Sequence, residues 1–127
     1  MKFKIFAIIF IAALLGACRT ATIIDVKDAT VVSNAANLSK EDVRKAIVRA
    51  GGSLGWQLKD NGPDAMVGTL ALRDHVAVVD IPYSAKQYSI TYKSSTNLNY
   101  DGTTIHSNYN GWIQNLHKAI NVQLNTL

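Results

Sequence analysis

The chain contains a single cysteine, two prolines and one glutamate among its 127 residues. One cysteine cannot form a disulfide within the chain, so the fold must be stabilised by its hydrophobic core alone or by partners. Basic residues are scattered. Without Lys2 and Lys4, 11 of the 13 basic residues remain against 9 acidic ones, a net charge of +2. This pattern lacks the basic patch typical of nucleic-acid binding, and the length predicts one domain.

The N-terminus carries two lysines, a hydrophobic run and the cysteine in close succession. Residues 5–17 are all apolar or glycine. Such a run is too short to cross a hydrocarbon core of about 30 Å, but it is typical of a secretory signal. The run ends in Leu15-Gly16-Ala17-Cys18, where two small residues directly precede the thiol.

This ending resembles the lipobox of bacterial lipoproteins. The resemblance implies that residues 1–17 are removed as a signal peptide and that Cys18 carries an S-diacylglycerol group and an N-acyl chain, with no other cofactor. Several acyl chains anchor a protein stably, because each buried methylene contributes about 0.8 kcal/mol. Arg19, rather than Asp, follows the cysteine, which by the same resemblance implies the outer membrane, facing the periplasm. We expect residues 18–37 to form the lipidated N-terminus, a tether and a first strand, and residues 38–127 to form one α+β domain.

Two segments have the pattern of amphipathic helices. Ser39 is expected to cap the first, with Asp42 at the capping-box position and Gly55 at its end. The second is predicted over about residues 106–125, where apolar residues recur every three or four positions. Gly111 lowers the helix propensity there, and we interpret it as a site of close packing against the sheet.

Residues 56–98 have a period of two, which indicates strands. Turns are expected at residues 61–64 and 84–86, and residues 73–74 form either a tight turn or a bulge. A polar loop is expected at residues 97–104. With a β-prone segment before the first helix, the order is β-α-β-β-β-α. This predicts an α+β two-layer sandwich: an antiparallel sheet of about four strands with both helices on one face.

Catalytic signatures are sparse. The three histidines, His75, His106 and His117, have no metal-binding spacing, and no metal site is predicted. No G-x-S-x-G motif is present, so we predict that the protein is not an enzyme. The alternative left open is a small periplasmic hydrolase that acts on an envelope substrate and uses His106 or His75 with a nearby Asp or Ser.

Tyrosines and asparagines are interleaved between residues 83 and 112. Aromatic rings can stack on a glycan or a peptide while amides form hydrogen bonds, which makes this group a candidate binding surface. The alternative is that the rings pack the sheet against the last helix. The candidate residues are Tyr83, Tyr88, Tyr92, Asn97, Tyr100, His106, Tyr109, Asn110 and Trp112.

A family resemblance rests on four motifs: Ile81-Pro82-Tyr83-Ser84, Tyr88-x-Ile90-x-Tyr92, Ser95-x-Asn97-Leu98-x-Tyr100 and Ile105-His106-x-x-Tyr109-Asn110-x-Trp112-Ile113-x-Asn115-Leu116. They resemble a group of small proteobacterial lipoproteins of unknown function, from about residue 38 to the C-terminus. The resemblance implies an envelope location but no activity. We therefore expect a membrane-anchored, non-enzymatic protein that binds another envelope component, either a protein or a glycan.

Mass spectrometry of the native protein tests the anchor. We expect a mature chain that begins at Cys18 and carries three acyl chains, as the lipobox resemblance implies. An unmodified Cys18 thiol or a retained leader would contradict this prediction.

Overall fold

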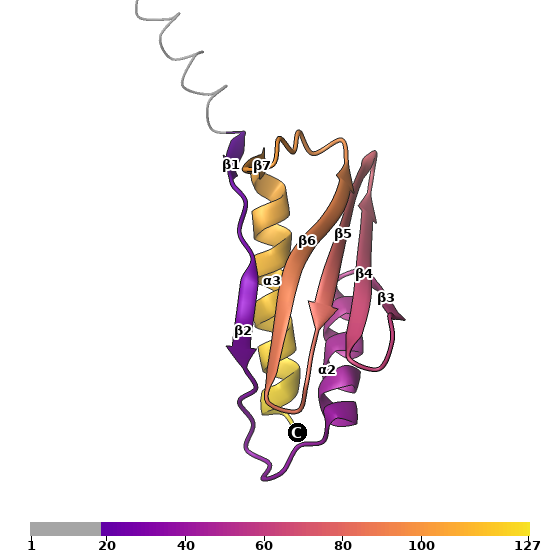
Figure 1. The fold of residues 1–127 in the computed structure, drawn as a ribbon, viewed down its shortest axis with the longest axis vertical. Coiled ribbons are helices and arrows are strands. Elements are labelled where there is room, and N and C mark those ends of the chain that lie inside the picture. The colour runs from indigo at the N-terminus through magenta and orange to yellow at the C-terminus, as the bar shows by residue number, and fades with distance from the viewer. Residues whose placement is uncertain (1–18) are drawn as a thin grey trace, which may run out of the picture.

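The computed structural model describes residues 19–127, so Cys18 and the predicted signal lie outside the described residues. The described chain forms two helices and seven strands: β1 (Thr20–Thr22), β2 (Val26–Thr30), α2 (Lys40–Ser53), β3 (Gln57–Asp60), β4 (Ala65–Leu72), β5 (His75–Pro82), β6 (Gln87–Thr96), β7 (Thr104–His106) and α3 (Ser107–Asn125). The α+β class is therefore confirmed (Figure 1).

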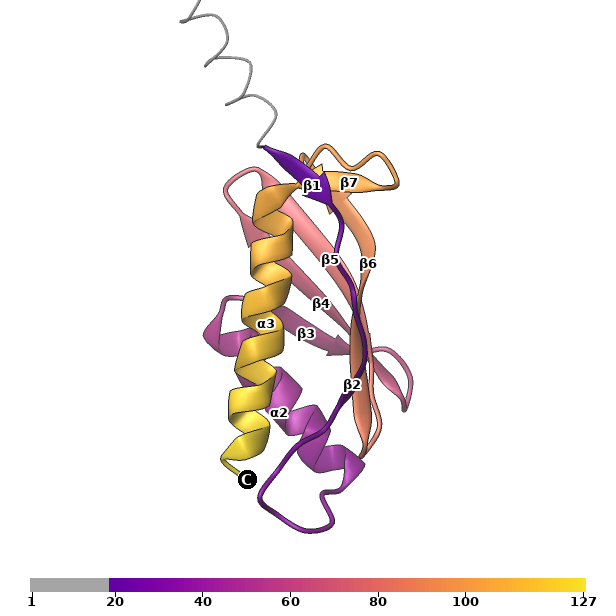
Figure 2. The same cartoon turned by 90° about the vertical axis from the view of Figure 1, so that its left-hand side faces the viewer.

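The main sheet has five antiparallel strands in the order β2-β6-β5-β4-β3, and β1 pairs with β7 in a separate two-stranded sheet. Figure 2 shows α2 and α3 on the same side of the main sheet. The other face of the sheet carries no helix in this view. The layers therefore follow the two-layer arrangement, whereas the expected number and order of strands were wrong.

Three short strands account for this difference. The segment before α2 forms two strands, β1 and β2, instead of one, and β2 lies at the edge of the main sheet beside β6. β3 adds the opposite edge. Residue 104, expected in a polar loop, begins β7, which pairs with β1 across more than 80 residues of sequence. Strands of three to five residues carry too little periodicity to be recognised without their partners.

The start of α2 follows the predicted capping box. The Asp42 amide donates to Ser39 Oγ (3.1 Å), and the Ser39 amide donates to the Asp42 carboxylate (3.0 Å). These hydrogen bonds hold the pKa of Asp42 below its usual value. Gly55, one residue beyond the C-cap Leu54, has a φ of +90°, a conformation that favours glycine.

The core lies between the helices and the covered face of the sheet. Val43 and Ile47 of α2 are fully buried, as are the α3 residues Tyr109, Ile113, Leu116, Ile120 and Leu124. The residues at positions 73–74 form a tight turn, since β4 and β5 pair continuously up to Leu72 and His75. Arg73 adopts a φ of +57° there.

The proposed packing role of Gly111 was wrong. A Cβ added at Gly111 would meet no atom within 4 Å, whereas one added at Gly51 of α2 would overlap the Leu58 side chain. Close packing therefore occurs at Gly51, where the end of α2 passes over β3. At Gly111 the glycine only lowers helix propensity.

These two glycines give a matched pair of stability predictions. Gly111→Ala should raise the free energy of unfolding by about 1 kcal/mol, because alanine is the better helix former and the space is open. Gly51→Ala should lower it by about 1–3 kcal/mol, because the added methyl must displace Leu58. Urea unfolding followed by circular dichroism measures both. Equal changes in the two variants would contradict the assignment.

Candidate functional site

The nine candidate surface residues do not form one surface. Tyr83, Tyr88 and Tyr109 are 7%, 1% and 0% exposed and belong to the core, as the alternative interpretation expected. The other six residues lie around the first half of α3 and the strands and loops beside it. These are Tyr92, Asn97, Tyr100, His106, Asn110 and Trp112.

Asn110 fixes the start of the described chain. Its side chain accepts a hydrogen bond from the Ile24 amide (3.1 Å) and donates one to the Thr22 carbonyl (2.9 Å). The Ser107 amide donates to the Arg19 carbonyl (2.9 Å). The segment between residues 19 and 24 is therefore bound to the N-terminal turn of α3. Asn110 therefore bridges backbone groups of this segment.

Two loops meet at the same end of the molecule. Asn97 donates to the Asp74 carboxylate (2.7 Å), and His75 Nδ1 lies 2.8 Å from the Asn97 carbonyl oxygen. Asp101 accepts hydrogen bonds from the Thr104 amide (2.7 Å), the Thr103 amide and the Thr104 hydroxyl, which lower its pKa. We call this region the β1 end. It comprises residues 19–22, the turn at residues 73–74 and the loop at residues 97–103.

Tyr100 of the β1 end stacks on Tyr92 of β6, whose ring also meets Tyr109 of α3. The rings of Tyr92 and Tyr100 have centroids 4.1 Å apart, and Tyr109 meets Tyr92 edge-on at 5.8 Å. Tyr100 is 39% exposed. The buried Tyr109 hydroxyl has no hydrogen-bond partner among residues 19–127, and burial raises its pKa. These rings mainly pack the end of the sheet against α3.

None of the three histidines stands beside a serine in a cavity described here. His75 Nε2 lies 3.6 Å from Asp74 in an exposed turn. His106 caps α3 by accepting the Asn108 amide through Nδ1 (3.2 Å). His117 Nδ1 lies 2.8 Å from the hydroxyl of Tyr88. Of the two histidines named in the hydrolase alternative, His75 has a carboxylate beside it, and its ring centroid lies 6.0 Å from that of His106.

The Tyr88 hydroxyl is the centre of a buried polar contact between β6 and α3. It donates to Asn121 Oδ1 (2.7 Å). Because a phenol has one hydrogen, the Nδ1 of His117 must then be the donor in their 2.8 Å contact. Burial raises the pKa of Tyr88, so the hydroxyl stays neutral. This side chain fixes the register of α3 on the sheet.

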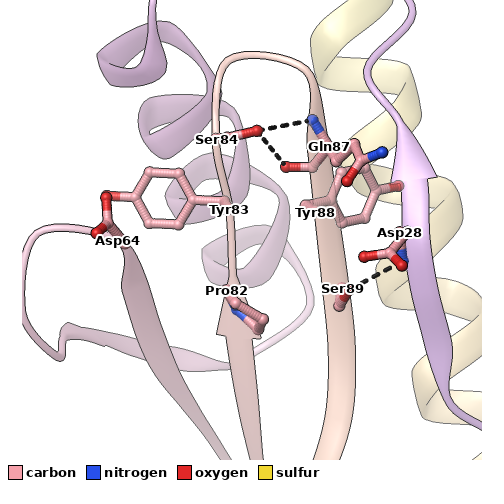
Figure 3. Close-up of a pocket in the computed structure, with 8 residues that line it drawn as sticks. All are labelled: Asp28, Asp64, Pro82, Tyr83, Ser84, Gln87, Tyr88 and Ser89. Carbon is pink, nitrogen blue, oxygen red and sulfur yellow. Dashed lines mark hydrogen bonds between the residues drawn. The ribbon is translucent and has the colours of Figure 1, made fainter.

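The opposite end of the molecule carries an open pocket of about 250 Å³ (Figure 3). The β5–β6 turn forms one side, where Ser84 Oγ accepts the Gln87 amide (3.1 Å). A bulge in β2 places Asp28 at the rim, with its amide bonded to Ser89 Oγ (2.9 Å). Asp64 lies across the pocket from Asp28 and forms an ion pair with Lys40.

The pocket presents hydrogen-bond acceptors beside the rings of Tyr83 and Tyr88. Two carboxylates and a side-chain amide face the opening, and the Tyr83 ring extends toward Asp64 in Figure 3. Lys40 Nζ lies 5.6 Å from the centroid of that ring. Sequence reasoning missed Asp28, Asp64 and Gln87, because they come from three separate segments. Two predicted turns could have pointed to this site: the Asn61-Gly62-Pro63-Asp64 turn contains Asp64, and the turn at residues 84–86 directly precedes Gln87.

Comparison of the chain with protein-family models, curated proteins and solved structures finds no match. Neither helix among residues 19–127 is long and apolar enough to span a membrane. Within the same part of the chain, no three His, Cys, Asp or Glu side chains are grouped as a metal site would require.

Two buried tyrosines provide a matched test of the polar contact. Tyr88→Phe should lower the free energy of unfolding by about 1–3 kcal/mol, because it leaves the partly buried partners His117 and Asn121 without this hydrogen bond. Tyr109→Phe should be neutral or stabilising, because its hydroxyl has no partner among the described residues. Urea denaturation midpoints measure both changes. A larger loss for Tyr109→Phe than for Tyr88→Phe would contradict this reading of the core.

Proposed function

We propose that this protein is a lipid-anchored, non-enzymatic module of the bacterial envelope that binds another envelope component, a glycan or a peptide segment of a protein. The observation that carries the proposal is the position of the lipobox. Arg19, the residue directly after Cys18, already contacts the fold, because the Ser107 amide donates to its carbonyl. Removal of residues 1–17 would leave all the described helices and strands in the protein. The acylated Cys18 would then directly precede Arg19.

The outer membrane, facing the periplasm, is the proposed location. Arg19 in place of Asp supports it, on the resemblance to lipoproteins stated above. The resemblance to small proteobacterial lipoproteins supports the same location and stays part of the proposal.

The pocket between Asp28, Asp64 and Gln87 is the proposed binding site. Of the Tyr/Asn surface, only Tyr83 and Tyr88 line this pocket, whereas Tyr109 is buried in the core and Asn110 bonds to the backbone. Acceptor groups at the mouth suit a partner rich in donors, such as sugar hydroxyls or amino groups. The β5–β6 turn, which lines the pocket, lies at the end of the fold away from β1 (Figure 1), where a partner can approach an anchored protein.

Photo-crosslinking in intact cells tests this proposal. A photoreactive residue in place of Gln87 should capture an envelope component. The same residue in place of Gln57, an exposed position on the edge strand β3, is the matched control and should not. Asp28→Asn and Asp64→Asn, combined, should reduce the capture at least fivefold, because neutral amides bind ammonium groups and hydroxyls less well than carboxylates do.

Capture that is equal from both positions, or absent from both, would count against the pocket as the binding site. Capture that persists unchanged in the double Asp→Asn variant would mean that the carboxylates do not hold the partner. Each variant is compared at equal abundance in the membrane fraction, so that a folding defect is not read as lost binding.

A further inference from the structure

We infer that the β1 end is a bilayer-contact surface that rests directly on the phospholipid headgroups, so that the body stands upright with its pocket turned away from the membrane. The inference rests on the proposed acylation of Cys18. It names the second partner of the protein, a lipid headgroup surface, and the residues that meet it. The region concerned is the β1 end defined above.

Residues 19–23 are bonded to the fold and do not form a free tether. Arg19 is already fixed by the Ser107 amide, Thr20 pairs with His106, and Ile23 donates to the Thr103 carbonyl (2.9 Å). Cys18 is one residue away, and consecutive Cα atoms are about 3.8 Å apart. The headgroup layer of one leaflet is about 5–8 Å thick. An acylated Cys18 therefore holds Arg19 within that layer.

Hydrogen bonds among its own segments hold the β1 end together. The Asn97–Asp74 contact joins the turn at residues 73–74 to the loop at residues 97–103. The His106 amide donates to the Leu98 carbonyl (2.8 Å), which ties that loop to the start of α3. The loops beside the anchor therefore form one platform, and the anchor fixes the orientation of the whole body.

The platform presents two exposed arginines, Arg19 and Arg73, at the proposed membrane surface. Two carboxylates lie beside its arginines: Asp74, whose side chain is 74% exposed, accepts from Asn97, and Asp101 accepts from Thr103 and Thr104. The guanidinium groups of Arg19 and Arg73 are exposed, and neither forms an ion pair or side-chain hydrogen bond with residues 19–127. Arginine matches the geometry of phosphate groups, which phospholipid headgroups supply.

The orientation also separates the two ends by the length of α3. Its 19 residues span about 28 Å at 1.5 Å per residue. The loop that contains Ala35 lies beyond the far end of this helix in Figure 1, where Asn34 donates to the Asn125 carbonyl. The pocket and this loop are consequently well outside the headgroup layer.

Fluorescence quenching by a headgroup-attached nitroxide lipid tests the orientation. The acylated protein, with either Thr103→Cys or Ala35→Cys labelled by bimane, is reconstituted in phosphatidylethanolamine–phosphatidylglycerol vesicles. Both positions are exposed, and neither side chain makes a hydrogen bond among the described residues. We expect at least threefold stronger quenching at position 103 than at position 35. Insertion of ten Gly/Ser residues between Cys18 and Arg19, a spacer of about 17 Å on average, should remove most of that difference.

The outcomes are distinguishable. Protein that floats with vesicles but shows equal quenching at both positions, or quenching that the spacer does not change, overturns the orientation and leaves the anchor standing. Protein that fails to float, with an unmodified Cys18 in mass spectrometry, overturns the proposed anchor and the orientation with it. Strong quenching at position 103 that falls with the spacer supports both.

Discussion

The structure depends on the burial of one stripe of α3 against the sheet. No disulfide can form within a chain that has one cysteine, so hydrophobic burial must hold the layers together. Five residues of the stripe are fully buried. Each contributes about 1.5–3 kcal/mol on leaving water. The Tyr88 hydroxyl, bonded to His117 and Asn121, gives this apolar contact a defined register.

The same helix organises both ends of the molecule. Its first turn holds residues 19–24 through Asn110 and Ser107, and its last turn lies beside the loop before α2. A helix that is fixed to the sheet along its length transmits the position of one end to the other. The position of the proposed anchor therefore determines the direction in which the pocket faces.

The tyrosines and asparagines that stood out in the sequence have mostly structural roles. A tyrosine combines a large apolar ring with one polar atom, so it suits both a binding surface and a half-polar core, and composition does not distinguish these uses. Tyr88 and Tyr109 are core residues, and Asn97 and Asn110 connect loops and strands. The pocket combines Tyr83 and Tyr88 with Asp28, Asp64 and Gln87, and no common spacing links these last three residues in the sequence.

The sequence by itself determined the elements whose signals are local. The capping box at Ser39, the stripe of α3 and the turn at residues 84–86 each depend on residues within a few positions of one another. Local patterns also predicted the α+β class. The tertiary structure alone decided the order of the strands, the pairing of β1 with β7 and the composition of the pocket. These features depend on contacts between segments far apart in the chain, whose free energy is gained only when the core brings them together.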